Sequence, residues 1–196
     1  MAKKESTLIN MTLTLFMVTF LASASLGLVH NATKAPIAQA KLAKKNLAIS
    51  NVLPPFDNQP LNMQKSYFID GDSVRLYMAQ NGDSLTGYAI ETFTNLGFSG
   101  NIKLMAGFLP NGDIYKIEVL EHKETPGLGD KMEAAKSGFS AQFIGKNPRS
   151  FVVKVKKDGG NVDAITASTI SSRAYCDAVN RAYKVFIQEG GSDKEP

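Results

Sequence analysis

Two short segments of this chain have residue types and spacing that could carry chemistry. The first is Glu121-His-Lys-Glu-Thr-Pro-Gly-Leu-Gly-Asp130. Gly127 and Gly129 let the backbone approach a ligand closely, and Pro126 fixes the start of the turn. Leu128 between the glycines would offer an exposed apolar side chain to a flat aromatic ligand. A plain turn between a strand and a helix explains the same residues, and on the local pattern alone it is the favoured interpretation.

The second segment is Asp163-Ala-Ile-Thr-Ala-Ser-Thr-Ile-Ser-Ser172, which places five hydroxyl residues at the start of a predicted helix. A helix N-terminus has unpaired N–H groups and the positive end of the helix dipole, so it favours phosphate. A threonine hydroxyl there could hold a phosphate group or be esterified to one. Helix capping by Ser and Thr accounts for the same composition, and it is the favoured interpretation when the segment is taken alone.

Residues for metal or acid–base chemistry are scarce. The chain has one cysteine, Cys176, and two histidines, which excludes an intramolecular disulfide and a Cys/His zinc cluster. We expect Cys176 to be a small core residue and His122 to be an ordinary surface or hydrogen-bonded histidine. No His/Asp/Ser constellation is recognisable, so we predict neither a metal site nor catalytic residues.

Strands are the predicted scaffold for both segments. Alternating apolar residues and turn signals indicate strands at 67–69, 74–78, 85–93, 101–108, 114–120 and 151–155. Asn81-Gly82 and Pro110-Asn-Gly-Asp113 are predicted hairpin turns, and Asp158-Gly-Gly160 closes the last strand.

Two helices flank these strands. A short helix is predicted over 35–49, with Pro36 in its first turn and Pro54-Pro55 ending it. A longer helix is predicted over 168–187, and its apolar stripe is Ile170, Ala174, Ala178, Ala182 and Val185. The fold class is therefore α+β, with a mostly antiparallel sheet and flanking helices.

The N-terminus carries a candidate membrane helix. Leu8 to Val29 is a run of 22 uncharged residues, which as a helix would span about 33 Å. A cleaved signal peptide is the competing interpretation, because Lys3 and Lys4 precede the run and small residues occur at 22–25. The run is longer than the usual apolar region of about 7–15 residues, so we favour a retained anchor. Lysines on both sides leave its orientation open.

The basic charge of the chain belongs to the same N-terminal segment. Residues 1–45 contain six lysines and one glutamate, whereas the remaining residues contain 16 basic and 17 acidic side chains. A nucleic-acid interface needs basic residues clustered on the folded domain. We therefore predict that this protein does not bind nucleic acid.

Taken together, the two segments make the chain recognisable. It resembles the G subunit of the Rnf electron-transport complex, a relative of the C subunit of the sodium-pumping NADH:quinone reductase. The family's His-x-Glu-Thr-Pro-Gly-Leu-Gly loop is present in full at 122–129. Its flavinylation signature, Asp-x-x-Ser/Thr-Gly-Ala-Thr/Ser, matches 163–169 except that Ala167 replaces Gly and Ser168 replaces Ala.

The resemblance implies an FMN cofactor joined through its phosphate to the Thr169 hydroxyl, with Asp163 read by a flavin transferase. Ser168 would be a second, less favoured attachment point. The resemblance also implies further cofactor-binding residues in the two segments: Glu124, Thr125, Pro126, Gly127, Leu128, Gly129, Thr166, Ala167, Ser168 and Ser172. The implied layout is an anchor at 1–34, a connecting helix and loop at 35–62, an FMN-binding domain at 63–188 and a disordered tail at 189–196.

The implied protein is a single-pass flavoprotein of the bacterial inner membrane with its domain on the periplasmic side. It would relay electrons, together with other subunits, in an ion-translocating ferredoxin/NAD oxidoreductase complex. Two alternatives stay open, namely the sibling subunit of the quinone reductase and an anchored envelope domain without a redox role.

Overall fold

The computed structural model describes residues 7–69 and 71–190. The chain divides into two compact units, Met1–Ala43 and Lys44–Pro196. The first unit contains most of helix α1 (Leu8–Asn51), and the second contains the end of that helix, a five-stranded sheet and helix α2 (Thr169–Gln188).

Helix α1 is long and apolar enough to cross a membrane. Its apolar side chains in the first unit are exposed. Three threonine hydroxyls on its apolar stretch donate to backbone carbonyls one turn earlier: Thr12 to Leu8, Thr14 to Asn10 and Thr19 to Leu15.

The prediction of a separate helix starting at Ala35 is wrong, because α1 runs from Leu8 to Asn51 without interruption. Pro36 lies inside this helix instead of in a first turn. Proline lacks an N–H and so removes one helical hydrogen bond. Alanines at 32, 35, 38, 40 and 43 flank it, and alanine has the highest helix propensity, which favours continuation of the helix on both sides.

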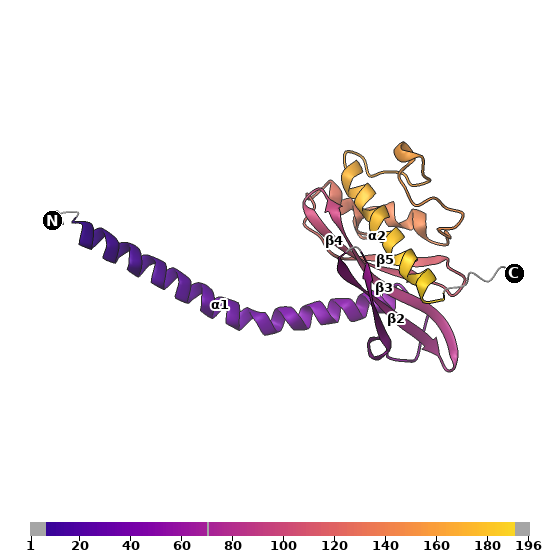
Figure 1. Cartoon of the computed structure of the whole chain (residues 1–196), viewed down its shortest axis with the longest axis horizontal. Helices are drawn as coiled ribbons and strands as arrows, with labels where there is room; N and C mark the ends of the chain where they lie inside the picture. Colours follow the sequence, from indigo (N-terminus) through magenta and orange to yellow (C-terminus); the bar gives the residue numbers. More distant parts are fainter. Residues whose placement is uncertain (1–6, 70, 191–196) are drawn as a thin grey trace. The chain divides into compact units, whose positions relative to one another are not determined.

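The sheet of the second unit is entirely antiparallel, with strands in chain order (Figure 1). Its strands are β1 (Gln64–Ile69), β2 (Asp72–Asn81), β3 (Ser84–Gly97), β4 (Gly100–Phe108) and β5 (Ile114–Glu121). The predicted hairpin turns at Asn81-Gly82 and Pro110–Asp113 are confirmed, since they join β2 to β3 and β4 to β5. The predicted α+β class is confirmed as well.

Helical segments cover both faces of this sheet. The buried face of α2 packs on one side against β-strand residues such as Ile90, Leu104 and Phe108. On the other side Ile49, Val52 and neighbouring residues pack with Tyr77, Ala79, Ala89 and Met105. Gly107 permits this second contact, because a Cβ there would lie 1.6 Å from the Val52 carbonyl oxygen.

The predicted strand at 151–155 is wrong. Val153 and Val155 are buried, as the alternation indicated, but the segment makes only an isolated parallel bridge between Val155 and Val162. A 3₁₀ helix at Lys156–Asp158 and a left-handed Gly159 turn the chain back on itself. Backbone hydrogen bonds such as Val162 N–H to the Lys154 carbonyl then take the groups that a neighbouring strand would need.

The end of α2 is fastened to the first strand. Glu189 follows the helix and accepts hydrogen bonds from the Lys65 ammonium and the Tyr67 hydroxyl. Burial and the neighbouring Glu189 carboxylate raise the pKa of Tyr67 to about 12. Of the predicted tail at 189–196, residues 191–196 lie outside the described residues, and Glu189 has the ordered contacts given above.

Candidate functional site

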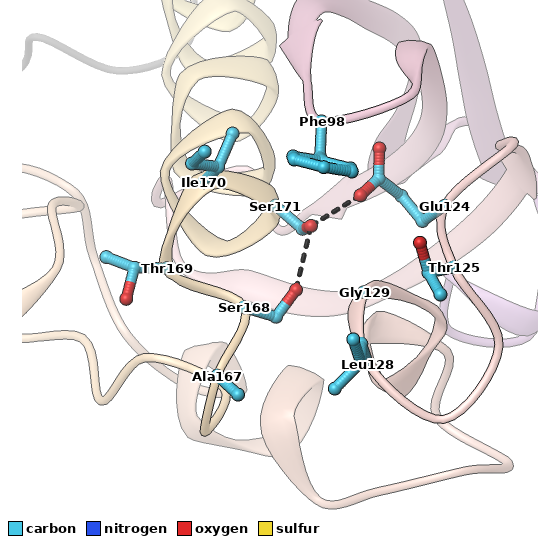
Figure 2. A pocket seen from close by; sticks show the side chains of 10 residues that line it. All are labelled: Phe98, Glu124, Thr125, Leu128, Gly129, Ala167, Ser168, Thr169, Ile170 and Ser171. Carbon is cyan, nitrogen blue, oxygen red and sulfur yellow. Dashed lines mark hydrogen bonds between the residues drawn. The ribbon is translucent and has the colours of Figure 1, made fainter.

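The two segments singled out in the sequence meet at one pocket of about 310 Å³ (Figure 2). One wall is the loop after β5, a second is the start of α2, and a third is the turn between β3 and β4. Its lining residues are Phe98, Glu124, Thr125, Leu128, Gly129, Ala167, Ser168, Thr169, Ile170 and Ser171.

The loop wall is held by His122. Its Nδ1 accepts the Glu124 backbone N–H at 3.0 Å, so the ring proton is assigned to Nε2, which lies 2.6 Å from Glu133 Oε1. Burial works against ionisation of Glu133, yet hydrogen bonds to His122 and Lys136 outweigh it and lower the pKa of this carboxyl. The prediction that His122 is a hydrogen-bonded histidine is confirmed.

The start of α2 is shaped by backbone and hydroxyl contacts. Ala167 adopts a left-handed conformation with φ of 60°, which is uncommon for a residue with a side chain. Ser172 is buried behind the pocket, where its Oγ donates to the Ser168 carbonyl at 2.9 Å and accepts the Ile165 N–H. The side-chain capping interpretation is wrong at Ser168, which is the N-cap residue but makes no side-chain cap hydrogen bond.

A chain of hydroxyls leads instead to a buried carboxylate. Ser168 Oγ donates to Ser171 Oγ at 2.9 Å, and Ser171 Oγ donates to Glu124 Oε2 at 2.5 Å. Glu124 is only 5% exposed, and its other oxygen accepts the Ser99 N–H at 2.9 Å. Gly129 leaves space for this chain, since a Cβ there would lie 2.6 Å from both Glu124 Oε2 and Ser171 Oγ.

Above this polar floor the pocket has an apolar rim. Phe98, Ile170 and Leu128 are 69%, 47% and 40% exposed, and each comes from a different wall. Thr169 is half-buried at the first residue of α2, and Figure 2 shows its hydroxyl on the side of the helix start away from Glu124 and Phe98. Ile170, the first residue of the predicted apolar stripe of α2, belongs to this rim.

Some of the predicted site residues lie away from the pocket. Pro126 and Gly127 are exposed in the loop but do not line it. Asp163 and Thr166 line a second pocket of about 430 Å³, together with Lys131, Gly138 and other residues. Asp163 also forms an ion pair with Lys156, with Nζ and Oδ1 2.7 Å apart.

Three lining residues, Phe98, Ile170 and Ser171, were not predicted as site residues. Phe98 had a sequence signal, since an aromatic residue in a turn bounded by Gly97 and Gly100 is difficult to bury. Ile170 and Ser171 had none, because their positions in a helix pattern do not tell which side of the first turn faces a ligand.

The arrangement fits the parts of an FMN molecule. The volume is in the range of small-molecule sites, and the apolar rim suits a flat ring system. The unpaired N–H groups at the start of α2 suit a phosphate, and the Thr169 hydroxyl lies at that point. In the described residues no group of three or more His, Cys, Asp and Glu side chains could hold a metal ion.

Comparison with known proteins agrees with this geometry. The family model of the FMN-binding domain matches residues 97–184, which contain every residue lining the pocket. The chain therefore contains an FMN-binding domain, which places it in the flavoprotein class.

Relatives of the chain narrow this class to one family. A protein of Pseudomonas aeruginosa (strain UCBPP-PA14) is 35% identical over 82% of this chain and 79% of its own length. A protein of Salmonella typhi is 37% identical over 82% and 84%, and one of Shewanella oneidensis is 41% identical over 60% and 57%. All three carry the name of the G subunit of an ion-translocating oxidoreductase complex, and the chain belongs to this family. The resemblance predicted from the sequence is confirmed.

Proposed function

We propose that this chain is a membrane-anchored subunit of an ion-translocating ferredoxin/NAD oxidoreductase complex, in which it relays electrons through FMN esterified to Thr169. The observation that carries the proposal is the convergence of both sequence segments on one pocket with Thr169 at its edge. When bound, FMN supplies the redox chemistry, and the protein holds and orients it.

The residues divide this task between them. The start of α2 would hold the phosphate, because its unpaired N–H groups and dipole favour a negative charge. Phe98, Leu128 and Ile170 would contact the ring, since they form the apolar rim. A covalent ester at Thr169 makes retention of the cofactor independent of its affinity, which matters in a dilute compartment outside the cytoplasm.

The placement in the cell follows from the same proposal. Helix α1 would anchor the chain once in the bacterial inner membrane, because its apolar stretch is long enough to span it. The FMN-binding domain would lie on the periplasmic side, where a flavin transferase would recognise Asp163 and load Thr169. Other subunits of the complex would supply and accept the electrons.

Mass spectrometry of the full chain, produced with and without the flavin transferase, tests the attachment. We expect a gain of about 438 Da on the peptide carrying Thr169, which is FMN esterified with loss of water. Thr169→Ala should abolish the gain. Thr33→Ala is the matched control, since Thr33 is an exposed residue of α1 that lines neither pocket, and it should keep the gain.

Ser168→Ala distinguishes the neighbouring hydroxyl. Ser168 is buried and its hydroxyl donates to Ser171, so we expect this variant to be loaded normally. A Thr169 peptide that stays unmodified in the presence of the transferase, or a colourless protein, would contradict the proposal.

A further inference from the structure

The pocket contains one charged side chain, and that charge is negative. Among its ten lining residues, all of them in the described part of the chain, Glu124 is the only acidic residue, and there is no Lys, Arg or His. Glu124 is also among the least exposed of these residues. A charge in such a place is screened less by water and salt than a surface charge is.

Within the described residues, the Glu124 carboxylate accepts two hydrogen bonds. Ser99 N–H donates to Oε1 at 2.9 Å and Ser171 Oγ donates to Oε2 at 2.5 Å. Ser171 Oγ in turn accepts from Ser168 at 2.9 Å, which leaves its own proton directed at the carboxylate. These neutral donors reduce the electric field of the carboxylate. A cation would cancel most of that field, but neutral donors do not.

The position of Glu124 determines which part of a bound ligand meets this charge. Glu124 and Phe98 lie on the other side of the Ser168–Ser171 contact from Thr169 (Figure 2). A flavin tethered by its phosphate to Thr169 and filling the pocket would therefore bring its ring system toward Glu124.

We infer that Glu124 lowers the reduction potential of the flavin held in this pocket, an inference that rests on the proposed function. Reduction adds negative charge to the ligand, and a fixed negative charge beside it makes that addition less favourable. The hydroxyls of Ser171 and Ser168 moderate the effect, because each donor that stabilises the carboxylate also offsets part of its field.

A purely structural role for Glu124 is the alternative that the test must exclude. The carboxylate joins the β3–β4 turn to the start of α2, and Gly97 and Gly129 leave no space for a side chain against it. If Glu124 only holds these walls together, removal of either partner of the Glu124–Ser171 contact should disturb the flavin in the same way. If its charge acts, the two removals should move the potential in opposite directions.

The experiment measures the midpoint potential of the full chain in detergent, loaded by the flavin transferase, by spectroscopic redox titration. Glu124→Gln keeps the shape and removes the charge, so we expect reduction to become at least tenfold more favourable, which is 59 mV for a one-electron couple. Ser171→Ala keeps the charge and removes a donor, so we expect a smaller shift to lower potential. Asp83→Asn is the control, because Asp83 is exposed at the opposite end of β3, and it should leave the potential unchanged.

Each outcome decides the inference. An unchanged potential in Glu124→Gln, or shifts of the same sign in both variants, overturns it. If Glu124→Gln does not load, Ser171→Ala decides alone, and a potential that is unchanged or raised in that variant overturns the inference. Failure of the wild-type chain to acquire covalent flavin would contradict the proposed function instead, so the two failures are distinguishable.

Discussion

The segment at 163–169 contributes to two pockets of different character. Its last three residues line the first pocket, which has an apolar rim and a buried carboxylate. Asp163 and Thr166 line the second, which includes the exposed polar side chains of Lys131 and Asp163. We propose that this short sequence holds the cofactor on one side and is recognised by a modifying enzyme on the other.

We expect the largest difference between the two pockets when one glycine in each is changed to alanine and the free energy of unfolding is measured. Gly129→Ala should lower the free energy of unfolding by about 2 kcal/mol, because the new Cβ would overlap Glu124 and Ser171. Gly138→Ala in the second pocket should change it by less than about 0.5 kcal/mol, since nothing lies within 4 Å. Denaturant unfolding of both variants measures the contrast, and equal losses would contradict it.

A change at Asp163 tests the second pocket as a recognition surface. Asp163→Asn should slow covalent loading at least about tenfold, as expected when one hydrogen bond to a charged group is lost. Its unfolding should remain close to that of the wild type, because the side chain is exposed. Lys156→Ala removes the ion-pair partner and keeps the carboxylate, so it should load normally. Mass spectrometry over time measures the rate of loading. If Asp163→Asn loads at the wild-type rate, the proposed role of the second pocket in recognition is wrong.

Ala167 lies between the residues that line the two pockets, and its change to glycine should stabilise the fold. Ala167→Gly should raise the free energy of unfolding by about 0.5 kcal/mol, because relief of the left-handed alanine exceeds the entropy cost of glycine. It also restores the glycine of the family's signature. Thermal unfolding measures the change. A destabilised variant would contradict the prediction, because it would show that contacts of the Ala167 methyl group stabilise the fold by more than its left-handed backbone costs.

Acid should weaken the loop wall of the first pocket. The pKa of Glu133 is lowered by His122 and Lys136 against the opposing effect of burial, so its contribution is present above its ordinary pKa of 4.5. That contribution is lost as the pH falls through the lower pKa of the folded state. Because Glu133 is partly exposed, we expect less than about 1 kcal/mol from it. Unfolding at pH 7 and pH 3 should differ less in Glu133→Gln than in the wild type, and an equal difference would contradict this assignment.

Local signals predicted most of the sheet and one of the two helices well. The hairpins at 81–82 and 110–113 depend on neighbouring residues only, and so does the stripe of Ala174, Ala178 and Ala182 in α2. The prediction at Pro36 is wrong because proline is common in the first turn of a helix, whereas a strongly helical sequence on both sides can also continue through it. At 151–155 the alternation correctly indicated burial, but strand pairing needs a partner that no local pattern reports.

The sequence predicted the site residues that lie within the two motifs. It did not predict the contacts that form only when distant segments meet in the tertiary fold. The loop and the hydroxyl-rich segment were found as sequences, and seven of the predicted residues line the pocket. The Ser168–Ser171–Glu124 chain was not found, because Glu124 and Ser171 are 47 residues apart. Phe98 meets them only because β3 and β4 bring their turn to the same place.

The hydrogen bonds between Glu189 and the side chains of Lys65 and Tyr67 in β1 have a consequence for folding during synthesis. Lys65 and Tyr67 precede their partner by 124 and 122 residues, and the side chains of α2 complete the main core. A polypeptide made from its N-terminus cannot close these contacts until the final turn has left the ribosome. Until α2 has been made, the sheet therefore lacks one of its two covering layers.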